Sequence, residues 1–246
     1  NIFHGLGVET TPDERREEIL SRSERALRQR VQTAMIAKGI RIVCEDIITS
    51  VAEGEGGSRV VRTKAGETLT VDQVMLALGR VPNTEYLGLE TLGVPLNQHG
   101  LPQVDPQTMQ VGDLPVFLAG DANPEKPFLH EAADEGHIAG MNALAVQAPT
   151  SYTRRTPLSI VFSTPTIASV GQALDQLDKQ QTVTGSASFH NQGRARAALR
   201  NHGGIRIYAD LATGHLLGAQ LCAPAGEHMA HLLALAIGQK LTVHDL

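Results

Sequence analysis

The segment Val116–Asp121, with the sequence VFLAGD, ends an apolar run in a glycine and a carboxylate. The run predicts a buried strand over Val116–Ala119. Gly120 would let a ligand approach the backbone, and Asp121 would stand at the carboxyl edge of a sheet, where open α/β sheets bind ligands. A carboxylate there can accept hydrogen bonds from sugar or polyol hydroxyl groups. The alternative is a plain turn, which is the commoner meaning of Gly-Asp at the end of a strand.

A helix is predicted next, from about Leu129 to Leu144. The backbone N–H groups of its first turn could receive a phosphate or an electron-rich ring edge. Glu131 and Asp134, three residues apart, could act as an acid/base pair, but a solvated helix face is the simpler interpretation.

Two glycine-containing segments have both a functional and a plain reading. Gly5-Leu6-Gly7 suggests a dinucleotide loop, but the third glycine of that fingerprint is replaced by Thr10, and a helix C-cap turn fits better. The segment Gly79–Asn83, GRVPN, indicates a turn between domains, since glycine and proline commonly mark turns and loops.

The cysteines and histidines indicate neither metal binding nor catalysis. Cys44 and Cys222 lie far apart in the sequence without a CxxC spacing, so we expect buried, small hydrophobic side chains. The histidines show no HExxH motif or clustered ligand spacing. We therefore predict no metal site and no catalytic residue in these 246 residues.

The elements that must position these residues follow from the hydrophobic pattern. Ser21 and Glu24 form a possible capping box for a helix over about 22–38, which Lys38-Gly39 ends. The continuous apolar run Val74–Leu78 predicts a strand covered on both faces. Shorter strands are expected at Ile40–Val43, Ile47–Val51, Val60–Thr63 and Glu67–Thr70.

The last part of the chain predicts a β-rich block after a polar linker at Gln147–Pro157. A helix over about Gly226–Gln239 closes this block. Its strands are expected at Ser159–Ser163, Thr182–Phe189, Gly204–Ala209 and Leu216–Leu221.

The overall composition is that of an ordinary globular protein. The 246 residues are 41% hydrophobic and 19% charged, with a formal net charge of −5, which excludes disorder, collagen and coiled coil. The mild acidity argues against a nucleic-acid partner. The sequence has no run of 18 apolar residues, and it does not open with a charged region followed by an apolar one. We therefore expect no membrane contact and a cytoplasmic location.

Four segments, in this order, closely resemble the pyridine nucleotide-disulfide oxidoreductases, the flavoenzyme family of dihydrolipoyl dehydrogenase, glutathione reductase and mercuric reductase. VMLALGRVPN resembles the strand and loop that leave the NAD(P) domain, and VFLAGD resembles the second flavin motif. FLHEAADEGHIAG resembles the helix that faces the flavin ring, and FSTPTIASVG the opening strand of the dimerisation domain. The four segments are Val74–Asn83, Val116–Asp121, Phe128–Gly140 and Phe162–Gly171.

The resemblance implies an α/β plus α+β fold in three parts. Residues 1–80 would be the later part of the NAD(P)-binding domain, 81–150 the second segment of the FAD-binding domain, and 151–246 a truncated dimerisation domain. It also implies FAD and NAD(P) as cofactors. The family's flavin GxGxxG, redox CxxxxC and C-terminal His-Pro motifs are not among these residues, so we expect an internal fragment that is inactive alone.

The resemblance assigns roles to particular residues. Asp121, after Gly120, would hold the ribityl chain of the flavin, and the backbone of Leu129, His130 and Glu131 would face the flavin ring. Gly79 and Arg80 would border the nicotinamide nucleotide. Where Pro12 ends the expected strand early, Glu14 could bind the ribose of NAD or Arg15 the 2′-phosphate of NADP, and the choice stays open.

The resemblance also implies partners. A homodimer would form through the helix at Gly226–Gln239 and the strands before it, with Met229, Leu232, Leu233, Leu235 and Ala236 as its apolar surface. The substrate would be a small-molecule or lipoyl disulfide. The segments Phe189–Arg196, Leu216–Gln220 and His228–Leu235 are most similar to dihydrolipoyl dehydrogenases, whereas the opening IFHGLGVETT is closer to glutathione reductases. A non-catalytic protein that keeps the dimerisation module is the alternative.

Overall fold

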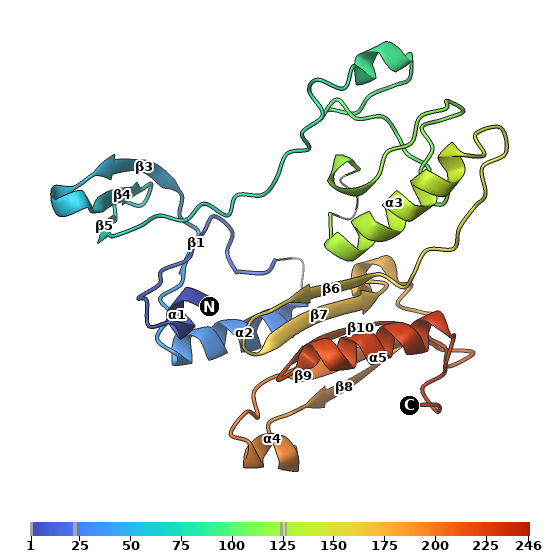
Figure 1. The fold of residues 1–246 in the computed structure, drawn as a ribbon. Helices are drawn as coiled ribbons and strands as arrows, with labels where there is room; N and C mark the ends of the chain where they lie inside the picture. The colour runs from blue at the N-terminus through green and yellow to red at the C-terminus, as the bar shows by residue number, and fades with distance from the viewer. Residues whose placement is uncertain (1, 22–23, 124, 126) are drawn as a thin grey trace. The chain divides into compact units, whose positions relative to one another are not determined.

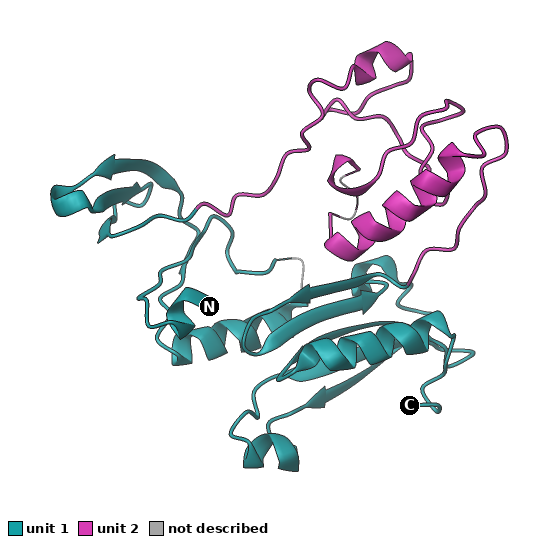
Figure 2. Ribbon diagram, in the orientation of Figure 1, with its two compact units in different colours: residues 1–75, 156–246 teal, residues 76–155 magenta. Residues whose placement is uncertain are grey.

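The computed structural model describes residues 2–21, 24–123, 125 and 127–246. The chain divides into two compact units (Figures 1 and 2): unit 1 contains residues 1–75 and 156–246, and unit 2 contains residues 76–155. The change from unit 2 to unit 1 at residues 155–156 falls inside the expected linker.

The core of unit 1 is an antiparallel sheet in the order β6-β7-β10-β9-β8. Its strands are β6 (Leu158–Val161), β7 (Thr166–Gly171), β8 (Thr182–Ser188), β9 (Gly204–Asp210) and β10 (Leu216–Ala223). This confirms the β-rich block and adds β7 as a strand of its own. The closing helix α5 (Gly226–Gly238) packs on one face, where Leu221 and Ala230 are fully buried. Two short helices, η4 (Leu174–Gln176) and α4 (Gly193–Ala197), lie in the connections.

The other face of this sheet is covered by helix α2 (Arg25–Ala37). Successive residues of a strand point to opposite faces, and Leu221 packs with α5 while Cys222 packs with Leu27 and Val31 of α2. Leu27, Val31 and Ala34 recur at helical spacing and form one buried stripe on α2.

The start of α2 differs from the prediction. The N-cap is Glu24, whose carboxylate accepts the Leu27 N–H at 3.2 Å, instead of Ser21. Contacts with the sheet fix this start, because the Glu24 N–H also donates to Gln220 at 2.9 Å. Positions 22 and 23 of the predicted helix lie outside the described residues.

The rest of unit 1 consists of small sheets. The predicted hairpin strands are confirmed as the antiparallel sheet β3 (Ile48–Glu53), β4 (Arg59–Thr63) and β5 (Thr68–Val71), with η1 (Glu55–Gly57) in the first turn. The strand predicted over Ile40–Val43 is displaced to β2 (Val43–Cys44).

Strand β2 pairs in parallel with β1 (Asp13–Glu14). The expectation that Pro12 ends the strand was therefore wrong: Pro12 lacks an N–H but keeps its carbonyl, which accepts the Val43 N–H at 3.0 Å. Near the N-terminus, helix α1 (Ile2–Gly5) ends where the Gly7 N–H donates to the His4 carbonyl at 3.0 Å. Gly5-Leu6-Gly7 is thus a helix C-terminal turn.

The buried strand predicted over Val74–Leu78 is wrong. The segment is irregular, and Met75, Leu76 and Leu78 are exposed by 74%, 72% and 89%. An apolar run of this kind forms a central strand only where a neighbouring strand pairs with it on either side. No strand pairs with it among the residues that the structure describes.

Unit 2 holds a small core of Val104, Met109, Val111 and Ile138, the last from helix α3 (Leu129–Ala143). The helix predicted from Leu129 is confirmed. The strand predicted over Val116–Ala119 reduces to a single bridge between Gln110 and Phe117, followed by the 3₁₀ turn η3 (Gly120–Ala122). A further 3₁₀ turn is η2 (Leu89–Leu92).

Candidate functional site

The Gly120-Asp121 turn lies against helix α3 in unit 2. Gly120 has φ +69°, and a Cβ at this position would lie 3.3 Å from Cβ of Ala132 on α3. The positive φ and the close approach both favour glycine. The Gly120 carbonyl accepts the Asn123 N–H at 2.8 Å, which closes the turn.

Arg80 joins this turn to the start of α3. Its guanidinium donates to Asp121 Oδ2 at 2.5 Å and to the Pro127 carbonyl at 2.6 Å. The structure therefore brings together two residues that the resemblance placed at different cofactors. Both side chains are more than half exposed, 63% for Arg80 and 56% for Asp121, so the ion pair is easily exchanged for another partner.

The first turn of α3 presents backbone donors beside this ion pair. The N–H groups of Leu129, His130 and Glu131 have no acceptor within the helix, because they belong to its first turn. Phe128 and His130 stack with ring centroids 5.7 Å apart, and Leu129 is 89% exposed. These donors and the Asp121 carboxylate can together bind a ligand that has both hydroxyl groups and electron-rich ring atoms.

The side chain of Glu131 does not lie on a solvated face, so that interpretation was wrong. Glu131 and Glu135 are 5% and 2% exposed, and both bind Arg154. Asp134 instead pairs with the exposed Arg155 at 3.0 Å. The sequence reasoning missed Glu135 and Arg154. The signal was present, because two glutamates four residues apart on one helix face repel each other unless a cation joins them.

The other predicted cofactor residues are divided between the units. Glu14 ends strand β1 in unit 1, and its carboxylate accepts the Arg16 N–H at 3.1 Å. Arg15 is exposed beside it. Gly79 and Arg80 belong to unit 2.

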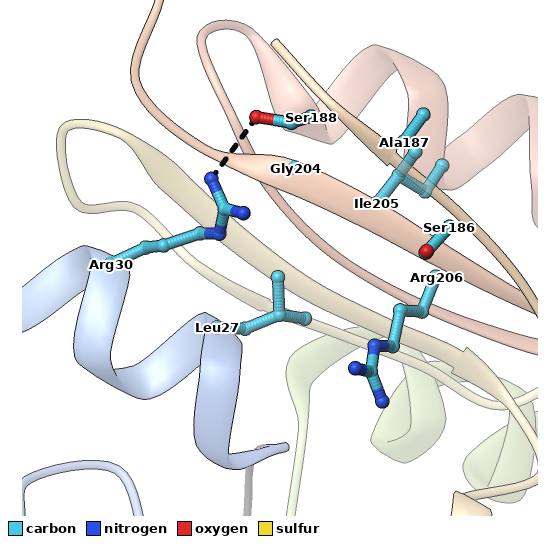
Figure 3. Close-up of a pocket in the computed structure, with 8 residues that line it drawn as sticks. All are labelled: Leu27, Arg30, Ser186, Ala187, Ser188, Gly204, Ile205 and Arg206. Atoms are coloured by element: carbon cyan, nitrogen blue, oxygen red, sulfur yellow. Dashed lines mark hydrogen bonds between the residues drawn. The ribbon is translucent and has the colours of Figure 1, made fainter. Parts of the chain in front are cut away.

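A cavity of about 130 Å³ lies between α2 and the edge of the large sheet (Figure 3). Its two guanidinium groups already have partners: Arg30 donates to Ser188 Oγ at 3.2 Å and to the Gly203 carbonyl at 3.0 Å, and Arg206 pairs with Glu24 at 3.3 Å. The two guanidinium groups lie on opposite sides of Leu27. The cavity therefore offers no convergent binding groups. It is lined by Leu27, Arg30, Ser186, Ala187, Ser188, Gly204, Ile205 and Arg206.

The two cysteines are free thiols that are poorly suited to redox chemistry. Burial raises the pKa of Cys222 to about 11 and also raises the pKa of Cys44. Since the thiolate is the reactive form, both side chains are weak nucleophiles at neutral pH.

No helix within 2–21, 24–123, 125 and 127–246 combines the length and the apolar character needed to cross a membrane. The same residues include no group of three or more His, Cys, Asp or Glu side chains arranged to hold a metal ion.

Comparison with known proteins identifies the family to which the chain belongs. Residues 1–136 match the family described as pyridine nucleotide-disulphide oxidoreductase, and residues 158–246 match the dimerisation domain of the same family. The chain belongs to this family, whose members use FAD and NAD(P).

Individual relatives agree with this assignment. The chain is 31% identical to mercuric reductase of Acidithiobacillus ferrooxidans, over 92% of this chain and 41% of the relative. It is 30% identical to dihydrolipoyl dehydrogenase of Geobacillus stearothermophilus, over 99% of this chain and 52% of the relative. The chain thus spans about half the length of these relatives.

Solved structures show the same fold. LpdA from Mycobacterium tuberculosis superposes with a TM-score of 0.83 at 26% identity, over 97% of this chain and 52% of that structure. The flavoprotein disulfide reductase RclA from Escherichia coli gives the same TM-score at 22% identity, over 98% of this chain and 55% of RclA, and supports the fold alone.

Proposed function

We propose that these residues form part of a FAD-dependent, NAD(P)-linked disulfide oxidoreductase that is most like dihydrolipoyl dehydrogenase. The observation that carries the proposal is the Gly120-Asp121 turn, which lies beside the first turn of α3. Its donor set fits a flavin: the Asp121 carboxylate can accept a ribityl hydroxyl, and the backbone N–H groups of Leu129, His130 and Glu131 can face the ring. A bound flavin would accept a hydride from the nicotinamide and pass the electrons on to a disulfide.

In this proposal the chain's own residues orient the flavin. Asp121 would exchange its exposed pairing with Arg80 for a ribityl hydroxyl, and Arg80 would then be free to border the nicotinamide nucleotide beside Gly79. Glu14 or Arg15 would select between NAD and NADP. We assign residues 1–80 to the NAD(P)-binding domain, 81–150 to the FAD-binding domain and 151–246 to the dimerisation domain.

We assign the homodimer surface to the outer face of α5. Leu232 and Leu235 are 67% and 62% exposed and form an apolar face that a second copy can cover. Leu233 and Ala236, which the sequence had included, are instead buried against the chain's own sheet. The two free thiols are compatible with a reducing compartment such as the cytoplasm.

Mercuric reductase is the second candidate, because the relative with that name shares 31% identity over 92% of the chain. The two candidates share the flavin site and differ in the acceptor of the electrons. Steady-state assays of the full-length protein with lipoamide and with Hg²⁺ as acceptors distinguish them.

The flavin assignment is tested with Asp121→Ala in the full-length protein that contains these residues. A hydrogen bond to a charged group contributes roughly 1.5–3 kcal/mol, so the affinity for FAD should fall about ten- to a hundredfold. Glu125→Ala, an exposed carboxylate in the following loop, is the matched control and should retain FAD. Equal FAD loss from both variants on dialysis, or none from Asp121→Ala, would contradict the assignment.

A further inference from the structure

Two buried glutamates and a partly buried arginine lie directly behind the Gly120-Asp121 turn. Arg154, whose side chain is 14% exposed, donates through one nitrogen to Glu131 Oε2 and to Glu135 Oε1, the latter at 3.3 Å. The second guanidinium nitrogen donates to the Pro106 carbonyl at 3.2 Å. A buried ion cluster of this kind is often no more stabilising than apolar residues of the same volume. Its presence therefore calls for a role besides stability.

The second oxygen of Glu135 reaches the turn itself. Glu135 Oε2 accepts the Gly120 N–H at 2.8 Å. Both backbone polar groups of Gly120 are thus held, the N–H by Glu135 and the carbonyl by Asn123. Since Asp121 is the next residue, the direction of its carboxylate depends on this bond.

The segment that carries Arg154 is itself fixed. Asn142, near the end of α3, donates to the carbonyls of Thr108 and Thr150, each at 3.0 Å, and accepts the Thr150 N–H at 2.8 Å. The Tyr152 N–H donates to the Gln107 carbonyl at 3.0 Å. These bonds hold the segment after α3 beside the helix, so the Arg154 side chain has a defined position next to the two glutamates.

We propose that Glu135, supported by Arg154, is a positioning residue for the flavin site: it holds the Gly120 N–H and so aims the Asp121 carboxylate. This inference rests on the proposed function. A charged acceptor makes a shorter and stronger hydrogen bond than a neutral one, and Arg154 balances the charge that burial would otherwise penalise. Glu135 therefore acts through Asp121 and does not itself touch the flavin.

The experiment is a double-mutant cycle on FAD binding in the full-length protein. The apoprotein is titrated with FAD for wild type, Glu135→Ala, Asp121→Ala and the double variant, and the visible circular dichroism of the bound flavin is recorded. Glu135→Ala should weaken FAD binding by about tenfold and change the flavin circular dichroism. In the double variant the loss of FAD affinity should equal that of Asp121→Ala alone. Once the Asp121 carboxylate is removed, the hydrogen bond that Glu135 makes to Gly120 no longer affects flavin binding.

Two further variants keep the experiment decisive. Glu135→Gln retains an oxygen that can accept the Gly120 N–H, so it should recover most of the FAD affinity even if Glu135→Ala folds poorly. Asp134→Asn is the matched control on the same helix, since its partner Arg155 is 83% exposed. It should leave both FAD affinity and circular dichroism unchanged.

The outcomes separate the two proposals. If Asp121→Ala weakens FAD binding while Glu135→Ala only lowers the melting temperature, the positioning role is wrong and the flavin site stands. Losses that multiply in the double variant would likewise show a purely structural role for Glu135. If Asp121→Ala leaves FAD binding unchanged, the proposed function itself fails at this site, and the positioning role fails with it.

Discussion

Replacement of Gly120 by alanine tests whether the shape of the turn, separately from its charge, supports the site. At φ +69° an alanine costs about 1–2 kcal/mol. Its Cβ would lie 3.3 Å from Cβ of Ala132, which α3 holds in place, so the turn must move. Movement would lengthen and weaken the 2.8 Å bond from Gly120 to Glu135, a charge-assisted bond that contributes about 1.5–3 kcal/mol when intact.

These contributions together predict a loss of about 3 kcal/mol in the free energy of unfolding. For a protein of 150–250 residues, a loss of this size lowers the melting temperature by roughly 6–12 °C. The loss of FAD affinity in Gly120→Ala should not exceed the loss in Asp121→Ala, because the displaced turn loses the same proposed contact between Asp121 and the flavin. Asp121→Ala itself should barely change the melting temperature, since its ion pair with Arg80 is more than half exposed.

Gly136→Ala, inside α3, supplies the control. A Cβ at Gly136 would have no atom within 4 Å, and alanine inside a helix stabilises it by about 0.5–1 kcal/mol relative to glycine. Differential scanning calorimetry of the three variants, with FAD titration, measures both effects. The reasoning is refuted if Gly120→Ala melts within about 1 °C of wild type, or if Gly136→Ala is destabilised as much.

Two further predictions concern the rest of the chain. Leu232→Glu on the outer face of α5 should convert the full-length protein from dimer to monomer in light scattering. Leu211→Glu, in an exposed turn, is the control and should leave the dimer intact. A Leu232→Glu variant that stays dimeric would show that this face is not the dimer interface. Hydrogen bonds, chiefly from the Thr63 hydroxyl, hold the pKa of Asp46 below its usual 3.8. Its stabilising effect should therefore be fully present above that pH and be lost as the pH falls through the lowered pKa. Asp46→Asn should flatten acid unfolding followed by circular dichroism, and an unchanged acid limb would contradict this.

The sheet of unit 1 could be predicted because its information is local. Each of β6, β8, β9 and β10 alternates or runs apolar between turn residues, and α2 and α5 carry a helical stripe that one stretch of sequence reveals. The prediction of a strand at Val74–Leu78 was wrong because pairing depends on residues elsewhere in the chain. Its apolar run has the composition of a central strand, but a strand also needs partners, and partners are a property of other segments.

The candidate site also has one part that adjacent residues reveal and one part that depends on distant residues. Gly120 and Asp121 could be found because a glycine and a carboxylate after an apolar run are adjacent in the sequence. Their support comes from Glu135 on α3 and from Arg154 beyond it, and neither residue belongs to a motif with Asp121. Only the close approach of α3 to Gly120 shows why one helix carries two buried glutamates. A carboxylate that must be aimed needs its backbone held, and in this protein a second, buried carboxylate holds it.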